Sequence, residues 1–243
     1  MGGSSGIGAA TANRFAKEGW KVLVASNDFS EARKVVENLE GSGHFAFDID
    51  VRCEEQIAAL KKEIIAVFGT FQVFVNSVGI SEGIHVIDSA FEKWNNPIEV
   101  MLYGTVNTCR ALVPLMEDAG RIINITSIHY SRVERNSSAY GMAKAAINQF
   151  TRSLALELAP RQILANCIAP GFIKTRMSIK ADGKNELESE WFHDNYIKYN
   201  HLPLKRAGMP EEVAGVVYFL AGEDASYITG SVIIVDGGLT ITF

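Results

Sequence analysis

The chain has 243 residues and a formal net charge of −5; 47% of its residues are hydrophobic and 21% are charged. This length can bury the core of one larger α/β domain or of two small ones, and no linker divides the chain. No run of Lys or Arg suggests a nucleic-acid or membrane surface, and no apolar run reaches the roughly 18 residues of a transmembrane helix.

The chain opens with MGGSSGIG, which places Gly2, Gly6 and Gly8 in a G-x3-G-x-G spacing before a helical pattern. Small residues let a pyrophosphate approach the free first amides of such a helix and the positive end of its dipole. A flexible linker or an expression scar has a similar composition, but the helix that follows at once favours a nucleotide-binding turn. The residues expected to contact the nucleotide here are Gly2, Ser4, Gly6, Ile7 and Gly8.

Short apolar runs then alternate with longer helical patterns. Such runs indicate a parallel sheet covered on both faces, which is a doubly wound α/β fold. The expected strands cover 21–26, 44–50, 71–79, 121–127, 163–171 and 230–238. The expected helices cover 7–18, 30–39, 54–68, 92–118, 140–158 and 210–222. We expect a single domain over 1–243, with a substrate lid at about 174–209, after the end of a strand.

The helical segment 140–158 begins with Tyr140 and carries Lys144 four residues later, so the two side chains share a face. A free tyrosine titrates near pH 10, and a nearby cation favours its ionised form. Ser127 ends the preceding strand, where its hydroxyl can hold a carbonyl oxygen beside Tyr140. A surface Tyr and Lys often have this spacing, but Ser127 and the glycine turn in the same domain favour a catalytic group.

Taken together, these motifs resemble those of the short-chain dehydrogenase/reductase family over nearly the whole chain, in its 3-oxoacyl-carrier-protein reductase and glucose-dehydrogenase type. The resemblance implies reversible hydride transfer between NAD or NADP and a secondary alcohol or ketone, such as a 3-oxoacyl thioester, a sugar or polyol, or a small cyclic alcohol. It implies that Tyr140 moves the hydroxyl proton, Ser127 stabilises the oxyanion, and Lys144 lowers the pKa of Tyr140 and holds the nicotinamide ribose. It also implies a homodimer or homotetramer.

Further family motifs fall on the later strands. The Asp that meets the adenine falls on Asp48, the NNAG motif on the NSVG sequence that starts at Asn76, and the PGxxxT motif on PGFIKT. The resemblance therefore implies cofactor contacts, beyond those of the glycine turn, from Ser26, Asp48, Asn76, Tyr140, Lys144, Pro170, Gly171, Ile173 and Thr175.

The position that selects the cofactor carries no decisive residue. Ser26 stands where NAD-dependent members carry an Asp for the ribose hydroxyls, and Ser5 where NADP-dependent members often carry a cation. Both cofactors therefore stay open, with a slight preference for NADP because the carboxylate is absent.

Two features weaken the match. Met101 replaces an Asn that in the family helps to keep a water in the proton path, so we expect a weakened but not abolished relay. Pro97 in the same helix suggests a kink or a late helix start. The alternative function is a catalytically impaired member that acts as a nucleotide-binding or scaffold protein.

In the family a central strand directly precedes the glycine turn, but here the turn starts at Met1. We expect that the native protein has further residues upstream; closure of the neighbouring strands on each other is an alternative. Without that strand, its neighbours would face a slot about one strand wide, since strands lie roughly 4.8 Å apart.

Some side chains are candidates for the substrate side. His85, His129 and Tyr130 follow the carboxyl ends of strands, where ligands bind in this architecture. The aromatic residues of 174–209 recur at helical spacing and are expected to pack within the lid, with packing against a neighbouring subunit as the alternative: Trp191, Phe192, Tyr196 and Tyr199.

The remaining composition points to the compartment. The three cysteines, Cys53, Cys109 and Cys167, lie far apart in no CxxC pair. They predict reduced, buried thiols rather than disulfides or a metal site. The N-terminus lacks the apolar segment of a signal peptide, so we expect a cytoplasmic protein.

Overall fold

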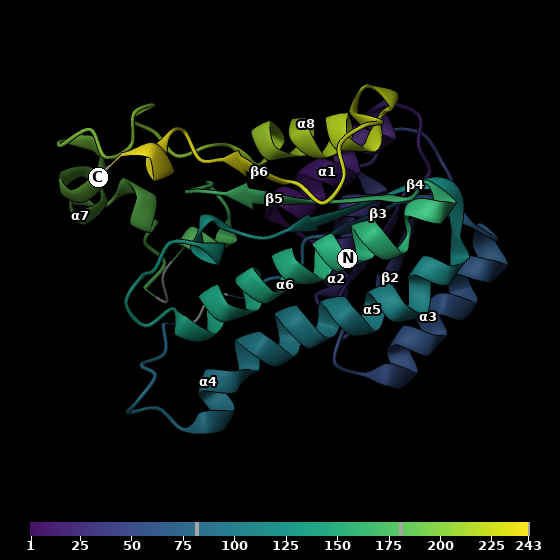
Figure 1. The fold of residues 1–243 in the computed structure, drawn as a ribbon, viewed down its shortest axis with the longest axis horizontal. Coiled ribbons are helices and arrows are strands. Elements are labelled where there is room, and N and C mark those ends of the chain that lie inside the picture. Colours follow the sequence, from purple (N-terminus) through teal and green to yellow (C-terminus); the bar gives the residue numbers. More distant parts are fainter. Residues whose placement is uncertain (81–82, 180–181, 243) are drawn as a thin grey trace.

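Parallel strands alternate with helices along the chain, as the apolar runs predict. The computed structural model describes residues 1–80, 83–179 and 182–242 (Figure 1). Its strands are β1 (Leu23–Ser26), β2 (Phe45–Asp48), β3 (Phe71–Asn76), β4 (Met116–Ile125), β5 (Leu164–Pro170) and β6 (Val232–Val235). Its α-helices are α1 (Gly6–Lys17), α2 (Phe29–Glu37), α3 (Glu54–Val67), α4 (Phe91–Pro97), α5 (Gly104–Leu112), α6 (Ser138–Glu157), α7 (Glu190–Phe192) and α8 (Pro210–Ala221). Every strand pairing is parallel, so the predicted doubly wound α/β fold is confirmed.

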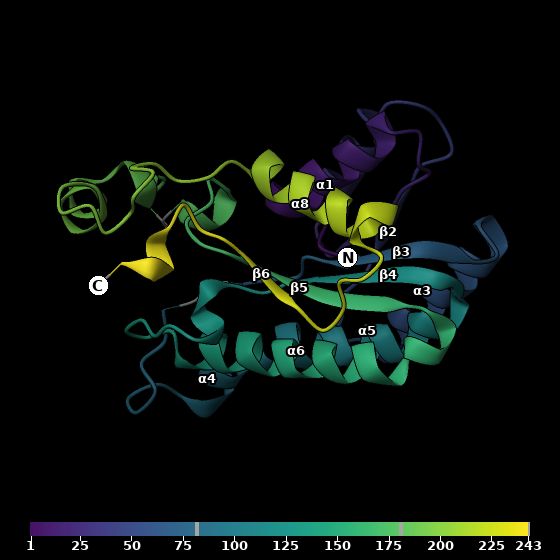
Figure 2. The same ribbon diagram turned by 45° about the horizontal axis from the view of Figure 1, so that its top comes forward.

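The helices form layers on the two faces of the sheet. In Figure 2, α1 and α8 lie on one side and α4, α5 and α6 on the other. On the first face, Phe15 of α1 packs in one hydrophobic cluster with Val213 and Val217 of α8. The opposite face packs Leu60 of α3 and Leu112 of α5 against the strands. Among the described residues, no helix has both the length and the apolar composition to cross a membrane.

The expected helix over 92–118 is wrong in two places. A π-helical turn at Ile98–Tyr103 separates α4 from α5, and a 3-10 turn at Val113–Leu115 ends the segment, so β4 already begins at Met116. Each break involves a proline, which has no amide to donate. Pro97 ends α4 and Pro114 lies in the 3-10 turn. The helix type thus changes directly after Pro97, whereas a late helix start is not seen, because α4 already begins at Phe91.

The sheet is divided between β1 and β3. Strand β1 pairs with β2 alone, and the other four strands pair in the order β3-β4-β5-β6. The first residues of the chain lie between the halves: the Met1 ammonium donates to the Val75 carbonyl (2.8 Å), Ser77 N donates to the Met1 carbonyl (3.0 Å), and Gly2 N donates to the Ala25 carbonyl (2.8 Å). Over the described residues, these few bonds replace a strand ladder.

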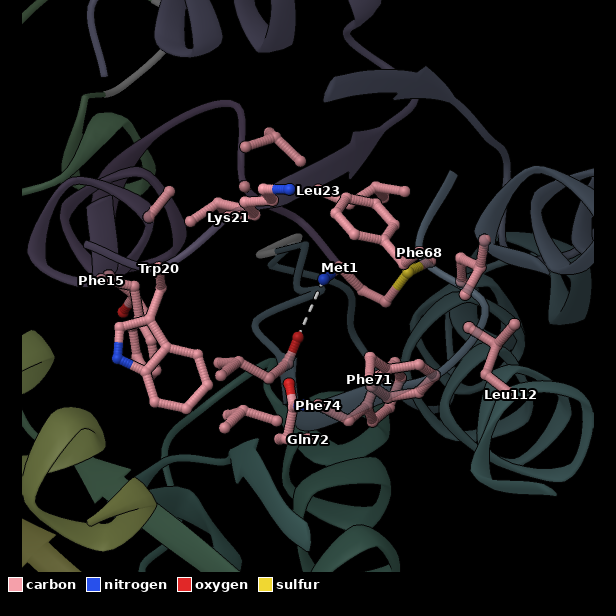
Figure 3. Close-up of a pocket in the computed structure, with 18 of the residues that line it drawn as sticks. Met1, Phe15, Trp20, Lys21, Leu23, Phe68, Phe71, Gln72, Phe74 and Leu112 are labelled. Atoms are coloured by element: carbon pink, nitrogen blue, oxygen red, sulfur yellow. Dashed lines mark hydrogen bonds between the residues drawn. The ribbon is translucent and has the colours of Figure 1, made fainter. Parts of the chain in front are cut away.

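Beside these bonds the slot is hollow. A cavity of about 770 Å³ runs between β1 and β3, and we call it the sheet cavity. In Figure 3, Trp20 and Phe15 lie on one side of Met1, and Phe68, Phe71 and Leu112 on the other. The expected slot is therefore present, and the neighbouring strands have not closed on each other. Burial lowers the pKa of the Met1 ammonium to about 6.

Residues 174–209 follow β5 as short turns rather than one long helix. They include 3-10 turns at Arg176–Ser178 and Glu186–Glu188, the short α7, and a π-helical turn at His193–Ile197. Residues 180 and 181 of this expected lid lie outside the described part. Tyr196 packs on Trp191 and Phe192, as expected, whereas Tyr199 is exposed and lies near His201.

The cysteines are free, but only two are buried. Cys109 and Cys167 lie in the core, whereas Cys53 is half-buried, so its predicted burial is wrong. Cys53 precedes the first residue of α3, and its Sγ lies 3.2 Å from Glu55. It therefore sits at a helix end, near the surface.

Candidate active site

The three predicted catalytic residues meet beyond the carboxyl end of β4. Ser127 follows that strand by two residues, and α6 presents Tyr140 and Lys144 on one face. Tyr140 and Ser127 share a side-chain hydrogen bond. The Lys144 ammonium donates to the Ile125 carbonyl at 3.0 Å and lies 5.6 Å from the centre of the Tyr140 ring. The structure thus brings together the three side chains that their spacing predicts to meet.

Burial controls the titration of this group. It raises the pKa of Tyr140, while the hydrogen bond with Ser127 acts in the opposite direction. It also lowers the pKa of Lys144 to about 8, since the ammonium is almost fully removed from water. The expectation that the pKa of Tyr140 is lowered is therefore wrong for the protein alone, because desolvation outweighs the hydrogen bond with Ser127.

The glycine turn has the shape that a phosphate group requires. Gly2 and Gly6 have φ values of +69° and +53°, which side chains rarely adopt. A Cβ at Gly8 would lie 2.1 Å from the Gly2 carbonyl oxygen. The Ser5 side chain makes no capping bond, and no acidic residue occupies the first turn of α1. The first amides of α1 are thus free of side-chain competition, and the turn fits a pyrophosphate.

Two serines mark the end of β1 beside this turn. The hydroxyls of Ser4 and Ser26 are 2.8 Å apart, and Asp28 N donates to the Ser26 hydroxyl at 3.2 Å. Ser26 is also paired in register with Asp48 of β2. The predicted nucleotide contacts Ser4, Ser26 and Asp48 therefore lie at one edge, and Asp48 is exposed there.

Asn76 is tied into the protein. Its amide nitrogen donates to the Thr105 hydroxyl at 2.7 Å, and its oxygen accepts from Val78 N at 3.2 Å. The side chain thus holds the loop after β3. That loop brings Gly79 to the active site, where a Cβ would lie 3.8 Å from the Lys144 nitrogen.

The PGFIKT segment lies across the glycine turn. A Cβ at Gly6 would lie 3.1 Å from the Thr175 methyl group, and one at Gly171 would lie 2.8 Å from Asp236 Cβ. Pro170 ends β5, and Ile173 pairs with Gly208 in a short bridge. Thr175, at the end of this segment, therefore lies against the glycine turn.

The structure also brings together groups that the sequence reasoning did not link. The His129 ring meets the Tyr140 ring edge-on at 5.6 Å, and its Nε2 lies 3.5 Å from Glu134. His85 pairs with Asp88 (3.0 Å) and lines a separate hollow of about 570 Å³ with Glu134. Sequence reasoning missed Arg176, which pairs with Asp28 and Glu31; its only signal was a cation directly after the PGFIKT motif.

Metal chemistry has no evident ligand set. Within the described ranges, no group of three or more His, Cys, Asp and Glu side chains is arranged to hold a metal ion.

A parallel sheet with a glycine turn and a Ser–Tyr–Lys group at its carboxyl edge defines a nucleotide-dependent α/β oxidoreductase. A family model described as enoyl-(acyl carrier protein) reductase matches residues 2–240. The chain belongs to the short-chain dehydrogenase/reductase family, and it is an enzyme of that class.

Individual relatives cover almost the full chain. It is 36% identical to carbonyl reductase family member 4 of Xenopus laevis, over 99% of this chain and 96% of that protein. It is also 36% identical to the 3-oxoacyl-[acyl-carrier-protein] reductase FabG of Chlamydia trachomatis, over 98% and 94%. The ligand-free aldohexose dehydrogenase (AldT) of Thermoplasma acidophilum is similar in structure, with a TM-score of 0.85 and 32% identity over 100% of this chain and 92% of that chain.

Proposed function

We propose that the protein transfers hydride reversibly between a nicotinamide cofactor, NADP(H) or NAD(H), and a secondary alcohol or ketone. The observation that carries this proposal is the meeting of Ser127, Tyr140 and Lys144 beside the glycine turn. One relative is named as a 3-oxoacyl-carrier-protein reductase and a structural neighbour as an aldohexose dehydrogenase, so thioester and sugar substrates are both candidates. A small cyclic alcohol is the third.

A bound nicotinamide nucleotide would supply or accept the hydride. The residues that would hold it are those of the glycine turn, Ser4, Ser26 and Asp48 at the adenosine side, and Ile173 and Thr175 across the cleft. The Tyr140 hydroxyl gives its proton to the substrate oxygen during reduction and takes it back during oxidation. Ser127 donates a hydrogen bond to the same oxygen as negative charge develops there, which is typically worth a few kcal/mol.

Lys144 positions this group and stabilises charge. Its hydrogen bond to the Ile125 carbonyl holds the ammonium beside the Tyr140 ring. Its pKa of about 8 leaves it mostly protonated at neutral pH, so it favours the tyrosinate that forms when Tyr140 gives up its proton. In the bound enzyme it would also hold the nicotinamide ribose.

The runner-up is a catalytically impaired, nucleotide-binding or scaffold protein. It is favoured by Met101, whose side chain is fully buried and whose carbonyl already accepts a hydrogen bond from the Thr105 hydroxyl. A water in the proton path would have to share that carbonyl. This predicts slow turnover rather than none.

The finer features follow from the same proposal. Residues 174–209 act as a lid over the substrate, with Phe192 and Tyr196 packing within it. The enzyme works in the cytoplasm as a homodimer or homotetramer, as is common in the family, and sedimentation would measure that state.

The test compares Tyr140→Phe with a matched control, Tyr218→Phe, on a panel of ketones with NADPH and NADH. Tyr218 lies on α8 against Phe15, on the far face of the sheet. Loss of the proton donor should lower kcat by about 10²–10⁴-fold while nucleotide affinity stays the same; the control should keep full activity. Full turnover of Tyr140→Phe would overturn the mechanism. Nucleotide binding without turnover in the unaltered protein would favour the runner-up.

A further inference from the structure

Arg176, from the segment after β5, lies beside the start of α2, where the adenosine part of the nucleotide is expected. Nη1 of Arg176 lies 3.5 Å from Asp28 Oδ2, and Nη2 pairs with Glu31. Both carboxylates belong to the start of α2, where Asp28 caps the helix by accepting from Glu31 N. Because Thr175 lies against Gly6, the chain crosses the glycine turn immediately before Arg176. The guanidinium thus stands on the α2 side of that turn.

The surroundings of Arg176 include the end of β1. Asp28 N donates to the Ser26 hydroxyl, which also contacts the Ser4 hydroxyl. Arg176 is therefore separated from Ser26 by one residue, Asp28, which contacts both. Ser26 supplies neither a carboxylate for ribose hydroxyls nor a cation for a phosphate, so selection between the two cofactors must come from a neighbour.

A second cation at the start of α2 shares Glu31 with Arg176. Lys34 lies on α2 and its Nζ is 2.6 Å from Glu31. Among the described residues whose ion pairs are known, Arg176 is the cation paired with Asp28. Its side chain is 56% exposed and that of Asp28 is 47% exposed, and exposed pairs of this kind are weak. A stronger anion can therefore displace Asp28 from the guanidinium.

We propose that Arg176 recognises the 2′-phosphate of NADP(H), with Asp28 and Glu31 as its resting partners. This inference rests on the proposed function, since it concerns the cofactor of the same site. A guanidinium can bind a phosphate group through two parallel N–H donors. The ion pair of Arg176 with Asp28, by contrast, is a single contact at 3.5 Å between exposed side chains. The phosphate replaces Asp28 while Glu31 keeps the guanidinium in place. NADH presents a hydroxyl at that position and leaves Arg176 on its carboxylates.

The experiment measures the Kd of NADPH and of NADH on the full chain by fluorescence titration, which needs no turnover. The variant is Arg176→Gln and its matched control is Lys174→Gln. Lys174 is two residues away and loses the same charge, but it pairs with Glu188 (3.0 Å) rather than with α2. Arg176→Gln should raise the Kd of NADPH roughly tenfold or more and the Kd of NADH less than about twofold. Lys174→Gln should change neither Kd by more than about twofold.

A second variant tests the competition. Asp28→Asn keeps an oxygen that can cap α2 but removes the charge that holds Arg176. The variant should lower the Kd of NADPH a few-fold and leave the Kd of NADH unchanged. In the unaltered protein, raised salt should weaken the binding of NADPH more than that of NADH.

Three results would overturn the inference. An unchanged NADPH affinity in Arg176→Gln would show that the guanidinium does not contact the phosphate. An equal loss of affinity for both nucleotides would show that Arg176 contacts a part of the cofactor that NADPH and NADH share. Binding of neither nucleotide by the unaltered protein would remove the proposed function too, whereas binding of NADH alone would remove only this inference.

Discussion

The two halves of the sheet differ in burial and in the chemistry they carry. Strands β4 and β5 are buried over most of their length and hold the Ser–Tyr–Lys group at their carboxyl edge. Strand β2 exposes both its ends, Phe45 and Asp48, and the pair β1–β2 holds the adenosine side. The halves meet through Met1 and Gly2 and across the sheet cavity.

This difference separates catalysis from cofactor binding in physical terms. The catalytic group rests on a continuous four-stranded ladder, so its geometry does not depend on the sheet cavity. A dinucleotide, by contrast, has to contact both halves at once. We therefore expect that whatever stabilises the junction of the halves also strengthens nucleotide binding.

The largest expected effect comes from filling the sheet cavity. Fusing five apolar, β-branched residues to Met1 would add a parallel strand between β1 and β3. Up to about ten ladder hydrogen bonds at roughly 1 kcal/mol each, together with the apolar burial, should raise the melting temperature by more than about 10 °C. Calorimetry measures this, with a Gly/Ser extension of equal length as the control. Equal melting temperatures for the two extensions would show that the cavity accepts no strand.

Core deletions compare the halves directly. Ile122 of β4 is fully buried, and Ile122→Ala should lower the free energy of unfolding by about 2–5 kcal/mol. Val24 of β1 lines the sheet cavity, so Val24→Ala should lower it by only about 1–2 kcal/mol. Denaturant titration measures both variants. Hydrogen exchange should show β1–β2 amides opening at lower free energy than β4–β5 amides; equal protection would contradict the comparison.

The pH dependence of stability separates the junction from the catalytic half. Burial lowers the pKa of the Met1 ammonium from 8.0 to about 6 and that of Lys144 from 10.5 to about 8. In each window the unfolded chain binds a proton that the folded protein does not, so stability rises with pH, from 6 to 8 through Met1 and from 8 to 10.5 through Lys144. Each step should amount to about 3 kcal/mol.

Lys144→Met is the control for this profile. It should remove the step above pH 8 and keep the step below it, as measured by urea unfolding at each pH. Stability that falls between pH 6 and 8 in both proteins would contradict the burial of the Met1 ammonium.

The smallest effect concerns Met101 in the catalytic half. Met101 is fully buried with Ala139, Ala143 and Ile147, so Met101→Leu should cost less than about 1.5 kcal/mol. Met101→Asn buries an amide there and should cost about 1–3 kcal/mol. Met142→Asn, at an exposed site on α6, should change stability by less than about 0.5 kcal/mol. Equal stabilities of the two Asn variants in denaturant would place Met101 outside the core.

Patterns of neighbouring residues correctly predicted the features that depend on local geometry, namely the strand positions and the shared helix face of Tyr140 and Lys144. Apolar runs located all the strands of the described chain, including β2 and β6, which are only partly buried. The i, i+4 spacing joined Tyr140 to Lys144, because helix geometry alone puts them on one face. The helical pattern over 92–118 failed where two prolines act against it, because apolar residues suit a helix and a buried strand equally well.

The sequence by itself determined the parallel α/β architecture, the glycine turn and the Ser–Tyr–Lys group. Each of them follows from residue patterns along the chain: alternating apolar runs, the spacing of glycines, and the i, i+4 spacing of Tyr140 and Lys144. Only the tertiary structure decided that the predicted slot stays open, that the pKa of Tyr140 is raised and that Arg176 pairs with Asp28, which is 148 positions away in the chain. Burial and long-range ion pairs depend on which elements pack together, and no local spacing records that.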